Sequence, residues 1–206
     1  MRSLAVVAAC VLASVLWLIA FSTGARYLIM MPALSVVATS VLIIVLVFMQ
    51  PVRARLKPKL RDVLWGVGVG GACVAATVVM YPLITSVAPS VADDVRFLYK
   101  LMPATWASIP IILLVVAAEE LLWRGALFDA LRADHPVLSA VVLLAMLYGA
   151  AQLGLGVPLL GVLGVGLGAL WAAEAALTGG LVAPLISHAI WTIAVFGVIP
   201  LEKVGR

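Results

Sequence analysis

The sequence predicts an all-α fold, a single polytopic bundle of about seven transmembrane helices, from its composition, its apolar runs and its basic residues. Of its 206 residues, 66% are hydrophobic and 11% are charged, and the mean hydropathy is +1.26. A soluble domain carries about 25% charged residues. We therefore expect residues 1–206 to form one transmembrane domain without a large soluble part.

Seven apolar runs approach the roughly 20 residues that a helix needs to cross a bilayer. Their approximate bounds are residues 4–22, 33–49, 63–87, 104–123, 137–153, 155–177 and 181–200. The first run follows Arg2 and imitates a signal peptide, but it is long enough to span and we expect it to be retained. The glycines at 66–71 and 161–168 predict close helix packing, because no Lys-Ser/Thr pair follows GVGVGG as a phosphate loop requires.

The basic residues are concentrated in one short loop, QPVRARLKPKLRD, which predicts the orientation of the chain. Such a loop lies on the cytoplasmic side, where it can also contact anionic headgroups. The N-terminus is then cytoplasmic as well, and residues 88–103 lie outside along the interface. Because the basic residues are localised in this way, the net charge of +4 does not indicate a nucleic-acid partner.

Ionisable residues inside apolar runs mark the candidate site, since each costs about 2.5–3.5 kcal/mol on insertion scales. They are Glu119, Glu120, Arg124, Glu174 and His188, joined by the neutral polar residues Tyr148, Gln152 and Thr192.

The stretch AAEELLWRGALFDAL contains the first three of these charges. Residues four apart share a helix face, so Glu120 can pair with Arg124. Glu119 is rotated by about 100° and has no obvious partner on its own helix. A carboxylate left free in a dry site suits general acid–base chemistry. Alternatively, the three charges end a helix at the cytoplasmic interface, where charges cost little.

Two further pairs have i,i+4 spacing. His188 can be a packing residue or a donor that stabilises negative charge. Thr192 shares its face, and taken alone it is better explained as bonding its own backbone. Tyr148 and Gln152 can belong to the site or cap a helix end at the interface.

Several chemistries are excluded by what the sequence lacks. There is no HExxH motif, and His135 and His188 are the only histidines. There is no GxSxG elbow. Cys10 and Cys73 form no CxxC and predict no disulfide. A water activated by a carboxylate, without metal or cofactor, remains.

Three stretches together resemble the CPBP family of intramembrane glutamic endopeptidases, which includes the type II CAAX prenyl proteases. That family carries EExxxR, then FxxxH, then HxxxN or HxxxD. Here EELLWR matches the first motif completely, and the block from GVGLGALWAAEAALTGG to SHAIWT resembles the last. The resemblance covers roughly residues 104–195 as a catalytic core, whereas the helices within 1–103 contribute only hydrophobicity.

The resemblance implies roles for the motif residues. Glu119 would activate water, and His188 would contribute to the oxyanion site. Glu120 and Arg124 would hold the helix and the Glu119 carboxylate in place. Three motif positions depart from the family: Tyr148 stands where the family has Phe, which is a mild change, Gln152 stands where it has His, and Thr192 stands where it has Asn or Asp. Gln can orient a water but cannot exchange a proton at neutral pH.

Glu174 can replace the missing His as an auxiliary carboxylate, pair with His188 or Arg124, or snorkel to the interface. The resemblance implies an endopeptidase that cleaves a peptide bond near the membrane, close to a substrate's C-terminus. The sequence shows no targeting or ER-retention signal, which fits a bacterial inner membrane. Its partners would be the substrate protein and the lipid bilayer. The alternatives are a catalytically degenerate binding or scaffold protein of the same fold, or a small transporter, for which the sequence lacks a repeat.

Overall fold

A computed structural model describes residues 15, 19, 27–101, 106–153 and 156–204. These residues form helices and contain no strand, which confirms the all-α fold. Apart from residues 15 and 19, the predicted span 4–22 lies outside the described residues, and so does Cys10.

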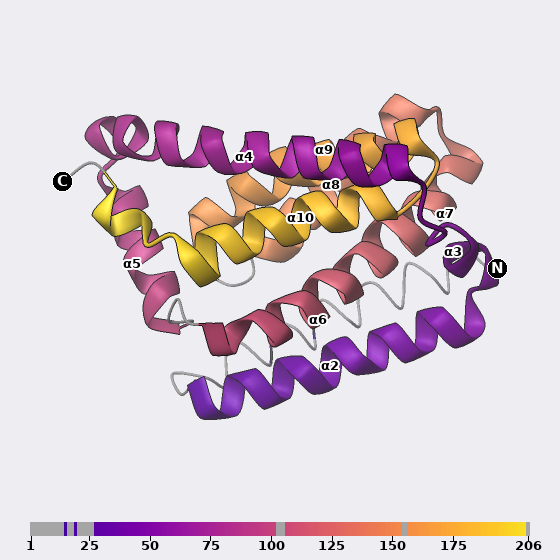
Figure 1. Cartoon of the computed structure of the whole chain (residues 1–206), viewed down its shortest axis with the longest axis horizontal. Helices are drawn as coiled ribbons and strands as arrows, with labels where there is room; N and C mark the ends of the chain where they lie inside the picture. The colour runs from indigo at the N-terminus through magenta and orange to yellow at the C-terminus, as the bar shows by residue number, and fades with distance from the viewer. Residues whose placement is uncertain (1–14, 16–18, 20–26, 102–105, 154–155, 205–206) are drawn as a thin grey trace.

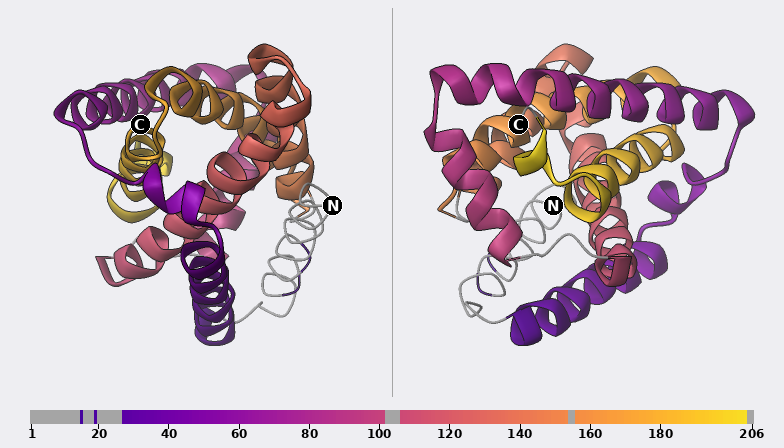
Figure 2. Two further views of the ribbon diagram at one scale, coloured as in Figure 1. Left: turned by 90° about the vertical axis from the view of Figure 1, so that its right-hand side faces the viewer. Right: turned by 60° about the vertical axis from the view of Figure 1, so that its left-hand side comes forward.

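Most helices run along the long axis of the molecule (Figure 1). They are α2 (Tyr27–Phe48), α4 (Leu60–Val87), α6 (Ile109–Glu119), α8 (Val137–Leu153), α9 (Pro158–Thr178) and α10 (Val182–Ile193). Shorter helices lie at the two ends: α5 (Ser90–Leu101) crosses one end, and α3 (Gln50–Ala54) and α7 (Phe128–Asp134) lie at the other (Figures 1 and 2).

Two π-helical segments extend these helices. The first, η2 (Glu120–Leu127), joins α6 to α7, and the second, η3 (Ala194–Val198), follows α10. The 3₁₀ turns η1 (Trp106–Ser108) and η4 (Leu201–Lys203) complete the described elements.

Among the described residues, α4 and α9 are long and apolar enough to cross a membrane. Residues 35–46, 137–153 and 182–198 form shorter apolar helices. The 17 residues of α8 rise about 26 Å at 1.5 Å per residue, less than the roughly 30 Å of a hydrocarbon core. The predicted count of seven spans therefore stays a prediction.

The fourth predicted span, 104–123, changes from α-helix to π-helix along its length. Its apolar part forms α6, and the helix widens into η2 at Glu120. All eight residues of η2 are buried. Irregular backbone is tolerated at membrane depth where protein covers it, and η2 meets that condition.

Glycines bring α4 and α10 close together. A Cβ at Gly66 would lie 2.6 Å from the Ala183 carbonyl oxygen, and one at Gly70 would lie 3.0 Å from Ser187 Cα. This confirms close packing for these two glycines, whereas Gly68 and Gly71 face open space.

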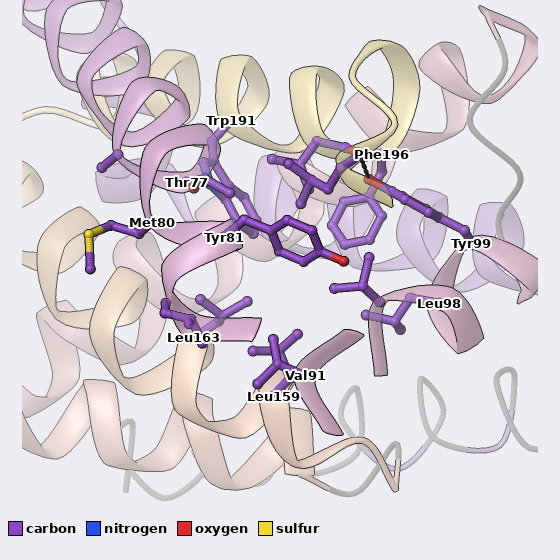
Figure 3. A pocket seen from close by; sticks show the side chains of 15 residues that line it. Thr77, Met80, Tyr81, Val91, Leu98, Tyr99, Leu159, Leu163, Trp191 and Phe196 are labelled. Carbon is purple, nitrogen blue, oxygen red and sulfur yellow. Dashed lines mark hydrogen bonds between the residues drawn. The ribbon is translucent and has the colours of Figure 1, made fainter. Parts of the chain in front are cut away.

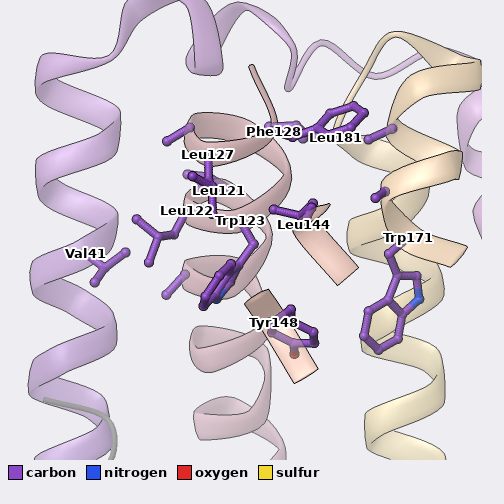
Figure 4. Close-up of a cluster of buried hydrophobic side chains, with 14 of the residues drawn as sticks. Val41, Leu121, Leu122, Trp123, Leu127, Phe128, Leu144, Tyr148, Trp171 and Leu181 are labelled. Atoms are coloured by element: carbon purple, nitrogen blue, oxygen red, sulfur yellow. The ribbon is translucent and has the colours of Figure 1, made fainter. Parts of the chain in front are cut away.

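The core surrounds η2. Figure 4 shows Leu121, Leu122 and Trp123 of this segment between Val41 of α2 and Trp171 of α9. Leu144 and Tyr148 of α8 approach the same segment. The candidate site is therefore built on the most enclosed helix of the described structure.

The basic loop closes one end of this core. Arg55 Nη1 donates to the Arg124 carbonyl at 3.2 Å and to Asp129 Oδ1 at 2.5 Å. The Arg55 carbonyl accepts the Leu181 N–H at 3.0 Å. The loop thus joins η2 and α7 to the start of α10, in addition to any role in orienting the chain.

Candidate active site

The transition from α6 to η2 carries the paired carboxylates. Glu119 is the last residue of α6 and is 9% exposed, whereas Glu120 opens η2 and is fully buried. Segments of π-helix are rare and often lie at functional sites. The burial of Glu120 and Arg124 excludes the alternative that these two charges only end a helix at an exposed interface.

Arg124 neutralises Glu120, as their spacing predicts. Its Nη1 donates to Glu120 Oε1 at 3.0 Å, and its Nη2 reaches the Gly168 carbonyl at 3.5 Å. The guanidinium also lies over the rings of Tyr148 and Trp171, 4.4 and 5.2 Å from their centroids. These cation–π contacts, with the hydrogen bonds, hold the guanidinium in one position between η2, α8 and α9.

His188 of α10 faces both carboxylates. Its Nδ1 lies 2.8 Å from Glu120 Oε1, and its Nε2 lies 3.7 Å from Glu119 Oε2. The ring stacks on Trp171, with centroids 3.6 Å apart and an angle of 19°. An ionised Glu120 only accepts hydrogen bonds, so Nδ1 carries a proton and Nε2 is directed toward Glu119.

Glu119 has partners on α8, which corrects the expectation that it is free. The Tyr148 hydroxyl donates to its Oε2 at 2.7 Å, and the Gln152 amide donates to its Oε1 at 3.4 Å. The i,i+4 spacing of Tyr148 and Gln152 places them one above the other, and α8 presents both to α6. Both side chains bond Glu119, so the alternative that this pair caps a helix end at the interface does not hold.

Glycines of α9 leave room for these two side chains. A Cβ at Gly168 would lie 3.0 Å from Tyr148 Cδ1, and one at Gly164 would lie 3.1 Å from Gln152 Cγ. A Cβ at Gly161 would overlap Leu153, whereas Gly166 faces open space. The glycines of α9 that face α8 therefore serve the site as well as helix packing.

The remaining candidates have surroundings that the sequence did not predict. The Thr192 hydroxyl is buried and has no hydrogen-bond partner in the described structure, so it does not bond its own backbone. Glu174 is 1% exposed and bonds the Ser187 hydroxyl; it neither snorkels to the surface nor bonds His188 or Arg124 directly.

Two residues of the site were not predicted. Trp171 stacks on His188, and Ser187 bonds Glu174. Their only sequence signal is position, because Trp171 lies one helical turn before Glu174 and Ser187 directly precedes His188. Among the described residues, no group of three or more His, Cys, Asp or Glu side chains is arranged to hold a metal ion.

An apolar cavity of about 250 Å³ lies beside the site, between α4, α5, α9 and α10 (Figure 3). Trp191 lines it, and its indole N–H donates to Thr77 Oγ1 at 2.9 Å. The Trp191 ring packs edge-on against Trp171, with centroids 6.2 Å apart. A chain of ring contacts therefore leads from the cavity wall to His188: Trp191 packs on Trp171, and Trp171 stacks on His188.

The part of the chain that carries the candidate site matches a known protein family. Residues 101–194 match the family model described as type II CAAX prenyl endopeptidase Rce1-like, which confirms the resemblance over this part of the chain. That family consists of membrane-embedded proteases. No curated protein and no solved structure matches the chain.

Proposed function

We propose, on the premise that residues 101–194 match the type II CAAX prenyl endopeptidase Rce1-like family, that this chain is an intramembrane glutamic endopeptidase. Glu119 activates a water, which attacks a peptide bond close to the membrane and near the C-terminus of a substrate protein. One observation carries the proposal. The Glu120 carboxylate is neutralised by Arg124, whereas the neighbouring Glu119 carboxylate faces His188 Nε2 at 3.7 Å.

The catalytic water would lie between Glu119 and His188. A separation of 3.7 Å is too long for a direct hydrogen bond, and a bridging water can contact both groups. Glu119 accepts a proton from this water while the water oxygen forms a bond to the peptide carbonyl carbon. The carboxylic acid formed then gives the proton to the departing amine, as general acid–base catalysis requires.

The oxyanion would be stabilised by His188. Because its Nδ1–H is directed to Glu120, Nε2 donates only when the ring is an imidazolium. The imidazolium and Arg124 then balance the two glutamates, and the site stays neutral as Glu119 takes up a proton and the oxyanion forms. The unpartnered Thr192 hydroxyl supplies a second donor one turn along α10.

Gln152 has a positioning role in this proposal. It holds Glu119 Oε1 through its amide, while Tyr148 holds Oε2. A glutamine cannot take a proton from water at neutral pH, so proton transfer falls to Glu119 alone. The family histidine at this position is therefore replaced by an orienting group.

For the placement of the protein, we propose seven spans in a bacterial inner membrane, with the basic loop and the N-terminus on the cytoplasmic side. The support is the charge of the loop and the apolar outer face of α4. Leu64, Val79 and Leu83 on that face are more than half exposed, as lipid-facing side chains are.

A termini-resolving proteome of host membranes tests the function. The strains are wild type, a deletion, and the deletion complemented at matched protein level with wild type, Glu119→Gln or Asp134→Asn. Asp134 is exposed and receives the same carboxylate-to-amide change, so it is the matched control.

We expect one class of peptide to keep an uncut C-terminal segment in the deletion and in Glu119→Gln, and to be processed normally in Asp134→Asn. The opposite result is full processing, or full restoration of what the deletion lost, by Glu119→Gln. That result would contradict the peptidase and leave a binding protein of the same fold.

A further inference from the structure

Glu174 and Ser187 form a buried polar pair that the proposed mechanism does not use. Glu174 lies on α9 and is 1% exposed, and Ser187 lies on α10 and is 0% exposed. Glu174 Oε2 bonds Ser187 Oγ, and its Oε1 has no partner among the described residues. An ionised carboxylate buried with one neutral partner and one bare oxygen is strongly disfavoured.

The number of available protons decides how this pair is bonded. Ser187 Oγ lies within bonding distance of Glu174 Oε2 and also 3.2 Å from the Pro184 carbonyl oxygen, which only accepts. A hydroxyl has one proton, so an ionised Glu174 would leave one of these two contacts without a hydrogen. A protonated Glu174 donates to Ser187 Oγ, and Ser187 then donates to Pro184, so both contacts are satisfied.

The charged neighbours of Glu174 do not offer it a counterion. On η2, Arg124 is committed to Glu120, and Glu120 itself is a like charge. On α10, His188 bonds Glu120 through Nδ1. On α4, the facing titratable group is the Cys73 thiol. Among the described residues, therefore, no cation pairs with Glu174.

The pair sits beside the catalytic histidine. Ser187 directly precedes His188 on α10, and Glu174 follows Trp171 by three residues on α9. One turn of each helix thus makes two contacts: Trp171 stacks on His188, and Glu174 bonds Ser187. Both contacts join α9 to the turn of α10 from which His188 faces Glu119 and Glu120.

We propose that Glu174 is a positioning residue, held as a neutral carboxylic acid that donates to Ser187 and thereby orients His188. Its part in catalysis rests on the proposed peptidase function, whereas its protonation does not. Glu174 contacts no reacting atom in this arrangement. Its loss should therefore lower kcat and leave KM unchanged.

Infrared difference spectroscopy of the full chain in lipid nanodiscs tests the protonation directly. The wild-type spectrum minus that of Glu174→Gln, at neutral pH, should show the carbonyl band of a protonated carboxylic acid, shifted by exchange into D₂O. Asp134→Asn is the control and should remove only ionised carboxylate bands. If Glu174→Gln removes ionised bands instead, the neutral acid is refuted.

Activity of matched variants tests the positioning. Glutamine keeps a neutral donor toward Ser187, so Glu174→Gln should retain kcat within about threefold of wild type. Glu174→Leu and Ser187→Ala break the link and should lower kcat about tenfold or more, because small misplacements of catalytic groups are costly. Equal losses in Glu174→Gln and Glu174→Leu would overturn the proposal.

The two proposals fail in distinguishable ways. If wild type cuts no peptide, the peptidase function is wrong, and the infrared spectrum still decides the state of Glu174. If wild type cuts and Glu174→Leu cuts equally well, the peptidase stands and the positioning role is wrong. Each variant is compared only after it elutes as a single folded species in size-exclusion chromatography.

Discussion

Replacing Arg124 by methionine should strongly destabilise the protein, because it leaves the charge of Glu120 buried. Both side chains are fully buried, and Arg124 Nη1 is one of two donors to Glu120 Oε1. Glu120 Oε2 has no partner in the described structure, so without Arg124 the carboxylate keeps only the hydrogen bond from His188 Nδ1. Methionine keeps most of the side-chain volume, which separates the electrostatic effect from a cavity.

The magnitude follows from this geometry. Removing one partner of a buried ion pair costs about 3–5 kcal/mol. His188 still donates to Glu120, so we expect the lower part of that range, about 3 kcal/mol. For a chain of this size each kcal/mol shifts Tm by about 2–4 °C, which gives a loss of about 6–12 °C.

The assay is thermal unfolding of purified protein in one detergent, followed by circular dichroism. The double variant Glu120→Gln/Arg124→Met removes both charges and should recover most of the lost Tm, since replacing a buried pair by neutral groups is often tolerated. Asp93→Asn, at the exposed Arg96–Asp93 pair, is the control and should change Tm little. The reasoning is refuted if Arg124→Met behaves like Asp93→Asn, or if the double variant is as unstable as the single one.

Three further predictions concern the surroundings of the site. Tyr148→Phe removes the 2.7 Å hydrogen bond to Glu119 and keeps the ring. Because hydrogen bonds to charged groups contribute about 1.5–3 kcal/mol, the cleavage rate should fall about tenfold or more. An unchanged rate in single-turnover assays would contradict this. Gly168→Ala should lower the free energy of unfolding by about 1–3 kcal/mol through overpacking, because its Cβ would lie 3.0 Å from Tyr148 Cδ1; Gly166→Ala, which enters open space, is the control in the same denaturation series. At Asp129, outside the predicted spans, burial raises the pKa of the carboxyl group, although Arg55 lowers it in part. Its contribution to stability is therefore largest below the unfolded pKa of about 3.9 and falls as pH rises through the folded pKa, and Asp129→Asn should flatten this part of the stability–pH curve.

The apolar runs were enough to predict several helices, and local spacing was enough to predict one contact. The run predicted at 137–153 is the helix α8, and the run at 155–177 corresponds to α9. The pairing of Glu120 with Arg124 was also predictable, because both residues lie on one helix and the spacing alone brings them together. These features depend only on neighbours within a few residues.

The contacts of Glu119 required the tertiary structure. Its partners Tyr148 and Gln152 lie 29 and 33 residues away along the chain, on a different helix. The sequence shows that these two residues share a face of α8, but not which helix that face meets. The expectation of a free Glu119 was wrong for this reason.

The sequence by itself determined the all-helical class, the limits of α8 and, within about three residues, those of α4 and α9, since these follow from composition and from the length of the apolar runs. It also supplied the candidate residues of the site, which stay a prediction. Only the tertiary structure decided that Trp171 stacks on His188 and that Ser187 bonds Glu174. Rotation of one helix against another is determined by where glycines allow close approach and where the π-helical turn after Glu119 shifts the helical register. Neither effect has a period in the sequence, so the inter-helical partners could be identified only once the helices were packed together.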